Sequence, residues 1–381
     1  MSANLSSSPK THTTAAARKL PSSKKKKKRS SALATLFFYT VFVLLLFGML
    51  FSLWFFLTPS GTNLRFLMAD TLITTQHRHW AAYLIGNDEL EKRVNRYWKQ
   101  FDLYTEVKEN KDLVQVNSTP AVAQVVQKPT VEIEPIEGTN FKGKLLIVND
   151  PKKLRIAVPG KAGKGEKVSS MVKRLGAVAG VNAGGFVDPE WKGNGFQPTG
   201  LVMSGGKIFY NDGSMNTPNH IVAIDKDGRL IAGKYKPSEL LQMGVQEAVT
   251  FAPRFIVNGV GQIKNAADGW GIAPRTCIAQ KEDGTILFAI IDGRQPGHSI
   301  GATLYDIQKI FLEHGAITAA NLDGGSSTVL VHNNEIINKP SSEYGERYLP
   351  TAWLVFEHPE QADIRNIWEG LDPSKIDPSK W

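Results

Sequence analysis

The sequence predicts an α+β protein: a mainly mixed β-sheet domain with a few flanking helices, preceded by one transmembrane helix and a helical stalk. Three observations support this class. From about residue 141 the chain consists of short β-rich runs divided by Gly, Asn and Asp. Two amphipathic helical patterns interrupt those runs. Residues 32–57 are uncharged and mostly apolar throughout.

The N-terminal segments predict how the chain is attached to a membrane. Residues 1–31 contain basic but no acidic side chains. As a helix, residues 32–57 would extend about 39 Å, enough to cross roughly 30 Å of hydrocarbon with some tilt. A cleaved signal peptide is the alternative, but its apolar core usually has about 7–15 residues. Because Lys and Arg collect on the cytoplasmic side, we expect a single-pass cell-membrane protein with a cytoplasmic N-terminus and an extracytoplasmic C-terminal domain.

The charge and the cysteine content exclude two classes of protein. The formal net charge of +9 comes from the basic tail over residues 1–31, since acidic and basic residues balance in the rest of the chain. This excludes a body that binds nucleic acid through a basic surface. The single cysteine, Cys277, excludes an internal disulfide framework and lies in a strand-like run, as a small core residue would.

Residues 58–140 are interpreted as an extracytoplasmic stalk and linker. The stretch from Leu64 to Ile85 is helix-like, and a second helix begins near Asn87 or Asp88. In that helix an apolar stripe predicts packing against another element; it consists of Leu90, Val94, Tyr97, Trp98 and Phe101. Residues 111–140 are rich in Val, Gln, Pro and Thr without helical period, which is typical of an extended linker.

The main domain is expected over residues 141–357. Its candidate strands are Leu145–Val148, Leu154–Val158, Ala177–Ala183, Gly200–Met203, Lys207–Tyr210, Ile221–Ile224, Arg254–Val257, Thr276–Ala279, Thr285–Ile291, Ile317–Leu322, Thr328–Val331 and Thr351–Phe356. Its candidate helices are Lys167–Leu175 and Thr303–His314, the latter with a capping box at Thr303 and Asp306. Residues 358–381 are expected to form a loosely held polar C-terminal tail.

Three motifs follow one pattern, in which an apolar strand ends in a polar residue and glycine. They are Asn182 with Gly184, Gly185 and Phe186; Asp292 with Gly293; and Asp323 with Gly324, Gly325, Ser326 and Ser327. Each motif alone is more often an ordinary turn. The third motif is the most informative, because its backbone N–H groups and hydroxyls suit an anion.

Arginines are the third component of the candidate site, beside the carboxylates and the anion-binding loop. The candidates are Arg254, Arg275, Arg294 and Arg347, and guanidinium groups match phosphate geometry. Two carboxylates, several arginines and an anion-binding loop together indicate chemistry on a phosphorylated sugar. A serine hydrolase is a weaker interpretation, because Ser326 and Ser327 lack a G-x-S-x-G context and no histidine stands in a compelling position.

The ordered motifs resemble the phosphodiester glycosidase family. They are Gly165-Glu-Lys-Val, Val181-Asn-Ala-Gly-Gly-Phe186, Gln197-Pro-Thr-Gly200, Ala252-Pro-Arg254, Pro274-Arg-Thr276, Asp292-Gly-Arg294 and Asn321-Leu-Asp-Gly-Gly-Ser-Ser327. The family includes the lysosomal uncovering enzyme and bacterial proteins linked to exopolysaccharide. The Ile73-Thr-Thr-Gln-His77 stretch resembles the membrane-proximal part of bacterial members. The low cysteine content separates this chain from the animal enzyme.

The resemblance implies cleavage of the glycosidic bond of a sugar-1-phosphodiester of the N-acetylglucosamine-1-phosphate type. It implies Asp323 and Asp292 as catalytic carboxylates. The substrate-binding groups would be Asn182, Gly184, Gly185, Phe186, Arg254, Arg275, Arg294, Gly324, Gly325, Ser326 and Ser327. No cofactor is expected, and a divalent cation stays an alternative that no ladder of alternating acids supports.

Two non-enzymatic hypotheses stay open. The protein would then be an anchored module that binds anionic polysaccharide, or a scaffold of a polysaccharide-export complex. The expected partners are a glycan or glycosyl-phosphodiester and, through residues 32–57, the membrane; nucleic acid is not expected.

Overall fold

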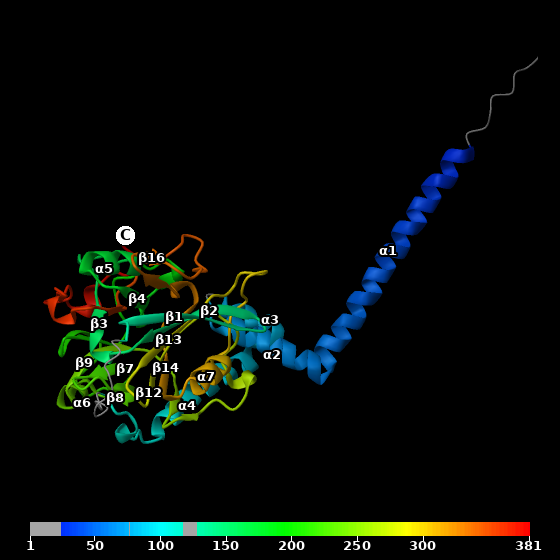
Figure 1. Ribbon diagram of the computed structural model, residues 1–381. Coiled ribbons are helices and arrows are strands. Elements are labelled where there is room, and N and C mark those ends of the chain that lie inside the picture. The colour runs from blue at the N-terminus through cyan, green and yellow to red at the C-terminus, as the bar shows by residue number, and fades with distance from the viewer. Residues whose placement is uncertain (1–23, 76, 117–127) are drawn as a thin grey trace, which may run out of the picture. The chain divides into compact units, whose positions relative to one another are not determined.

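The computed structural model describes residues 24–75, 77–116 and 128–381. The chain divides into two compact units, Met1–Thr62 and Asn63–Trp381 (Figure 1). Each unit is described by itself below.

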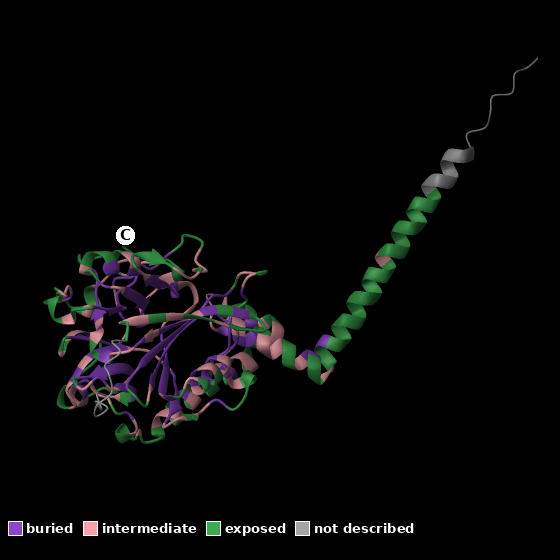
Figure 2. Ribbon diagram, viewed as in Figure 1, coloured by how far each residue is buried: buried purple, intermediate pink, exposed green. Residues whose placement is uncertain are grey.

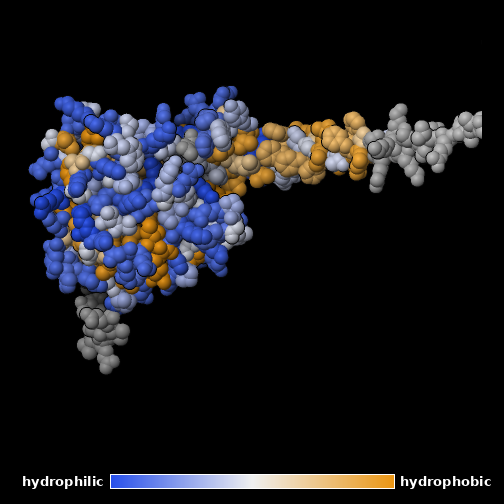
Figure 3. Space-filling model, turned by 90° about the horizontal axis from the view of Figure 1, so that it is seen from above, coloured by the Kyte–Doolittle hydropathy of each residue, from blue (hydrophilic) through white to orange (hydrophobic). Residues whose placement is uncertain are grey.

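The first unit contains one long helix, α1 (Lys24–Leu57). Within it, Ser31–Leu57 has a mean hydropathy of 2.5 and is long and apolar enough to cross a membrane, although a signal sequence would meet the same criteria. Apolar residues cover this helix, whereas the visible face of the second unit is mostly hydrophilic (Figure 3).

Three antiparallel sheets form the body of the second unit. The largest has the strand order β1-β2-β13-β12-β14-β10-β11, and the others have the orders β16-β15-β4-β17-β3 and β6-β5-β9-β7-β8. The bounds are β1 (Val131–Gly138), β2 (Phe141–Val148), β3 (Leu154–Ala157), β4 (Ala179–Asn182), β5 (Leu201–Ser204), β6 (Lys207–Asn211), β7 (Asn219–Asp225), β8 (Leu230–Tyr235), β9 (Val245–Thr250), β10 (Arg254–Val257), β11 (Val260–Gly261), β12 (Arg275–Lys281), β13 (Ile286–Ile291), β14 (Ala316–Asn321), β15 (Leu330–His332), β16 (Glu335–Ile336) and β17 (Ala352–Val355).

The three sheets share one apolar core. Side chains from all of them meet there, including Phe288 of the first sheet, Trp353 of the second and Val222 of the third. These strands are the buried interior visible in Figure 2. The α+β class is confirmed, and every ladder between the described strands is antiparallel, which differs from the mixed sheet that we expected.

Short helices cover the outer faces of the sheets. They are α5 (Val168–Leu175), α6 (Pro237–Gln242) and α7 (Leu304–Glu313), with 3-10 turns at Pro151–Lys153, Pro189–Trp191, Ala266–Asp268, Gly325–Ser327, Pro359–Gln361 and Pro373–Lys375. The predicted capping box is present at the start of α7, where the Thr303 side chain accepts a hydrogen bond from the Asp306 N–H and the Asp306 carboxylate accepts one from the Thr303 N–H.

The segment expected to be a stalk packs against the sheets instead. It contains α2 (Pro59–Ile73), a 3-10 turn (Arg78–Trp80), α3 (Ala81–Ile85), α4 (Asn87–Glu106) and a 3-10 turn (Lys111–Leu113). Buried Arg93 donates to Asp70 at 2.8 Å and so joins α4 to α2. Phe101 of α4 lies edge-on to the ring of Trp270, with centroids 4.8 Å apart. The predicted apolar stripe therefore finds a partner within the same compact unit.

Two further segments differ from the expected linker and tail. Residues 131–138, expected within the linker, form β1, which pairs with β2 along its whole length. The C-terminal tail carries Trp368, which is 3% exposed and donates from Nε1 to the Phe196 carbonyl at 3.1 Å. Both segments are polar on average, and the few apolar residues that anchor them escape a composition-based interpretation.

We expect Phe101→Ala to lower the free energy of unfolding by about 3–5 kcal/mol, because it leaves a cavity beside Trp270. Urea denaturation measures the change. Leu103→Ala is the matched control on the same helix, since Leu103 is 56% exposed and should change stability by less than about 0.5 kcal/mol. Equal losses in the two variants would contradict this packing.

Candidate active site

A cavity of about 450 Å³ opens where two sheets meet at the ends of their strands. Asp323 follows β14 of the first sheet, while Gly185 and Phe186 follow β4 of the second. The N–H of Asp323 donates to the Ala183 carbonyl at 3.0 Å, which ties the two strand ends together. The cavity is further lined by Ile73, Thr74, Thr75, Arg78, Asp188, Trp191, Thr199, Phe251, Trp270, Ala273, Pro274, Arg275, Arg294, Asn321, Gly324, Gly325, Ser326, Ser327 and Arg347.

Asn182 supports this junction through hydrogen bonds of its buried side chain. Its amide nitrogen donates to the Asp323 carbonyl. Its amide oxygen accepts from the Thr276 hydroxyl at 2.8 Å and from the Val329 N–H at 3.1 Å. The side chain is fully buried and does not line the cavity among the residues given above. Asn182 thus holds the backbone at Asp323 and Val329, and its expected direct contact with sugar does not fit its position.

Asp323 is a carboxylate that lines one end of the pocket. Its Oδ2 atom is buried and has no hydrogen-bond partner among the described residues. Burial raises the pKa of Asp323 to about 6, while hydrogen bonds from Ser327 and the Gly324 N–H and the charge of Arg347 oppose this rise. A carboxyl with such a pKa changes its protonation close to neutral pH and is a candidate for acid, base or nucleophilic chemistry.

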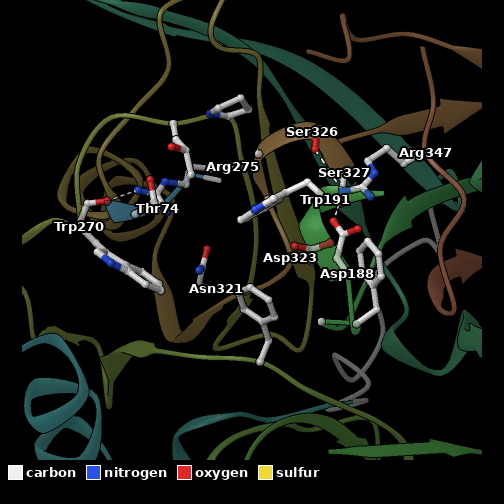
Figure 4. A pocket seen from close by; sticks show the side chains of 18 of the residues that line it. Thr74, Asp188, Trp191, Trp270, Arg275, Asn321, Asp323, Ser326, Ser327 and Arg347 are labelled. Atoms are coloured by element: carbon white, nitrogen blue, oxygen red, sulfur yellow. Dashed lines mark hydrogen bonds and ion pairs between the residues drawn. The ribbon is translucent and has the colours of Figure 1, made fainter. Parts of the chain in front are cut away.

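A second carboxylate, Asp188, lies at the same end of the pocket. It forms an ion pair with Arg347 at 2.8 Å and accepts from the Gly193 N–H at 2.7 Å. The Arg347 guanidinium also lies 5.0 Å from the ring centroid of Phe186. Figure 4 shows Asp188, Asp323, Ser326, Ser327 and Arg347 gathered at one end, with Thr74 and Trp270 at the other.

Aromatic rings form much of the remaining wall. Trp191 is 49% exposed. Trp270 lies opposite the end that holds Asp188 and Asp323. Phe186 and Phe251 also line the cavity. Rings of this kind provide flat apolar surface next to polar groups, as small-molecule sites require. The pocket therefore combines carboxylates with surfaces on which a sugar ring can pack.

Two arginines present cationic groups to the cavity. The guanidinium of Arg294 makes no hydrogen bond or ion pair among the described residues, and it lies directly over Gly325. Gly325 has φ +60°, and a Cβ there would come within 3.3 Å of the Arg294 Nη2 atom, so glycine permits this approach. Arg78 is exposed at the rim and uses its Nε to donate to the Ile73 carbonyl.

Arg275 borders the cavity but has a structural environment. Its guanidinium donates to the carbonyls of Trp270, Gly271 and Ala302 at 2.5, 2.9 and 3.2 Å. Burial lowers the pKa of Arg275 to about 10. Its donors hold the loop that carries Trp270, so an expected contact with phosphate would compete with these bonds.

Two predicted residues lie outside the pocket. Arg254 donates to the carbonyls of Tyr104, Val107 and Ala232, which attaches the end of α4 to the sheet. Asp292 accepts from Lys339 N–H at 2.9 Å, Asn338 at 3.1 Å and His298 at 2.8 Å.

We expected Arg254 to bind substrate and Asp292 to act as a catalytic carboxylate. Both expectations are corrected, because hydrogen bonds within the fold already occupy these two side chains. Of the remaining predicted residues, Gly184 also stands behind the cavity, where a Cβ would come within 2.9 Å of Val249. Gly185, Phe186, Arg275, Arg294 and Asp323 through Ser327 line it together.

The sequence motifs missed the second carboxylate and the N-terminal wall. Asp188 and Trp191 sit in a loop without a recognisable pattern, and Arg347 was noticed only as one arginine among several. Thr74 and Thr75 fall within the stretch that resembles membrane-proximal segments, which is the one signal that pointed toward them.

Two other kinds of site find no support in the described part of the chain. It contains no group of three or more His, Cys, Asp or Glu side chains that could hold a metal ion. None of the described residues lining the cavity is a histidine, so neither Ser326 nor Ser327 has the usual base of a serine hydrolase there. Burial raises the pKa of Cys277 to about 12, in keeping with an inert core thiol.

Comparison with known proteins confirms the family resemblance. Residues 175–356 match the family model of phosphodiester glycosidases. The chain is 30% identical over 211 residues to YomE, an uncharacterized SPbeta prophage-derived protein of Bacillus subtilis, and the match covers 54% of this chain and 31% of that protein. The chain thus spans about a third of that relative's length.

A solved structure shares the fold. It is the catalytic domain of zebrafish N-acetylglucosamine-1-phosphodiester alpha-N-acetylglucosaminidase, auto-inhibited by its pro-peptide. The TM-score is 0.52 at 21% sequence identity, and the match covers 62% of this chain and 87% of that chain.

The raised pKa of Asp323 predicts a specific pH dependence of stability. The folded carboxyl holds its proton more tightly than the unfolded one, whose pKa is 3.8, so stability falls as pH rises from about 4 through 6. Asp323→Asn lacks this loss. We expect its stability relative to the parent to improve by up to about 3 kcal/mol between pH 4 and 7. Urea denaturation across this range measures it; exposed Asp112→Asn is the control, and parallel curves for all three proteins would contradict the assignment.

Proposed function

We propose that this protein is a membrane-anchored extracytoplasmic hydrolase that cleaves the glycosidic bond of a sugar-1-phosphodiester. The observation that carries the proposal is one pocket that holds two carboxylates, Asp188 and Asp323, together with the guanidinium of Arg294 and aromatic rings. The family match over residues 175–356 supports a glycosidase-type function. The sugar of the zebrafish enzyme's name, N-acetylglucosamine, is the first candidate for this chain.

The charges of the pocket suit the two halves of such a substrate. Arg294 is available to pair with the phosphate, since no described residue competes for it, and Arg78 adds a second cation at the rim. The Gly324–Ser327 turn also lines the cavity, and Gly325 lies against Arg294, but the N–H groups of Gly325 and Ser327 already donate to the carbonyls of Pro274 and Gly324. Trp191 and Phe186 provide surfaces for the sugar ring.

The chemistry of the leaving group decides what the carboxylates must do. Water supplies the oxygen that bonds to the anomeric carbon, the bond from that carbon to the phosphate oxygen breaks, and its electron pair leaves with the phosphate monoester. Such a group departs readily, so catalysis needs positive charge near phosphate more than a strong general acid. Arg294 is placed to provide that charge.

Asp323 acts in its ionised form in this scheme. It either accepts a proton from the attacking water or attacks the anomeric carbon itself, and both roles require the carboxylate. With a pKa of about 6, the carboxylate form prevails above neutral pH. Asp188, held by Arg347, supplies the second negative charge beside the positively charged transition state.

The setting of the reaction follows from the N-terminus. The basic run of residues 24–29 precedes the apolar helix, which favours a cytoplasmic tail and an outer catalytic domain. We therefore place the substrate outside the cell membrane, among exopolysaccharides or cell-wall glycopolymers. A non-catalytic module that binds anionic polysaccharide is the alternative; it would retain glycan affinity without turnover.

Sugar release tests the proposal. Purified full-length protein in detergent should liberate N-acetylglucosamine from a simple N-acetylglucosamine-1-phosphodiester, with kcat/KM rising between pH 5 and 7 around a midpoint of about 6. Asp323→Asn should lose at least about 1,000-fold in rate while staying folded. Glycan binding without release by the parent, retained in Asp323→Asn, would favour the binding module instead.

A matched pair of arginine variants separates catalysis from folding. Arg294→Gln should lower kcat/KM by about 100-fold or more with little change in stability, because its guanidinium has no described partner within the fold. Arg254→Gln makes the same chemical change outside the pocket and should reduce stability, leaving the rate per folded molecule near that of the parent. A loss of stability in Arg294→Gln, together with a loss of rate per folded molecule in Arg254→Gln, would contradict the assigned roles.

A further inference from the structure

The loop of residues 188–194 carries two groups of the pocket on an unusual backbone. Asp188 lies at its start and Trp191 near its middle. Glu190 and Trp191 both have positive φ values, +49° and +63°. Two consecutive non-glycine residues in this region are strained, and such strain persists only where the surroundings hold it.

The end of the chain supplies those surroundings. The Asn194 N–H donates to the Pro378 carbonyl at 2.7 Å, and the Asn194 side chain donates to the Lys380 carbonyl. The indole N–H of Trp381 donates to the Lys192 carbonyl at 2.9 Å. Three hydrogen bonds from residues 378–381 therefore fall on Lys192 and Asn194, just after the strained pair.

Trp381 also contacts Tyr348, the residue that follows Arg347 in the chain. Its ring packs edge-on against Tyr348, with centroids 5.7 Å apart and planes at 85°. Lys164 lies over both rings, its ammonium 3.9 Å from the Tyr348 centroid and 4.8 Å from that of Trp381. Trp381 thus binds Lys192 of the loop through its N–H and packs against Tyr348 through its ring.

We propose that residues 378–381 act as a positioning clamp that holds Asp188 and Trp191 in the pocket. Trp381 is the central positioning residue; it touches neither the pocket's lining carboxylates nor substrate. The clamp lies outside residues 175–356, the range that matches the family model. The effect on catalysis rests on the proposed function, whereas the effect on the loop does not.

Hydrogen–deuterium exchange on the full-length protein tests the clamp without any assay of activity. A variant lacking residues 379–381 should exchange the amides of 187–197 at least about tenfold faster than the parent. Peptides from β12 and β13 should be unchanged. Lys375→Ala, which changes an exposed side chain of the same tail paired with Asp372, is the matched control. Unchanged exchange over 187–197 would overturn the clamp.

Kinetics then test positioning. Deletion of residues 379–381 should lower kcat/KM by about 10- to 100-fold, as misplacement of a catalytic group does. Trp381→Phe keeps a ring beside Tyr348 but removes the N–H donor to Lys192, and should give an intermediate rate. Parental rates in the deletion variant, despite faster exchange of the loop, would overturn the positioning role. A parent that releases no sugar would refute the proposed function, and the exchange result would still decide the clamp.

Discussion

The buried amide of Asn182 is the constraint on which the pocket depends. With one donor and two accepted bonds it joins β4 to β12, to the Asp323 carbonyl and to the backbone at Val329. A buried polar group must be satisfied, so these segments cannot separate without leaving donors and acceptors unpaired. The carboxylate therefore stands on a rigid junction between two sheets, while its own Oδ2 atom lacks a described partner. Hydrogen bonds are thus complete at the supporting amide and incomplete at the carboxylate.

The arginines near the pocket likewise differ in whether the fold supplies partners for their guanidinium groups. Arg254 and Arg275 donate to backbone carbonyls. Arg254 thereby holds α4 in place, and Arg275 holds the Trp270 loop. Arg347 is paired with Asp188. Arg294 is different because it has the pocket in front of it and glycine beneath it. Residues of one type thus form part of the scaffold, pair with a carboxylate or face the pocket unpaired, and only their surroundings distinguish them.

The sequence was sufficient for most strands and for half of the site. Short β-rich runs separated by Gly, Asn and Asp identified twelve strands, because strands that are buried on both faces leave continuous apolar runs. It could not separate Asp323 from Asp292, since both follow a strand and precede glycine. The difference lies in which partners reach them: Lys339 and Asn338 satisfy Asp292, and they are close only in the folded chain. Asp188 was missed for the opposite reason, as a loop held by distant contacts leaves no local pattern.

The pocket takes one of its walls, Thr74, Thr75 and Arg78, from a segment about a hundred residues before the region that defines the family. Those residues carry no part of the support for Asp323. One wall of the pocket and the junction that supports Asp323 therefore come from separate stretches of the chain, so the wall can change without altering the hydrogen bonds of Asn182.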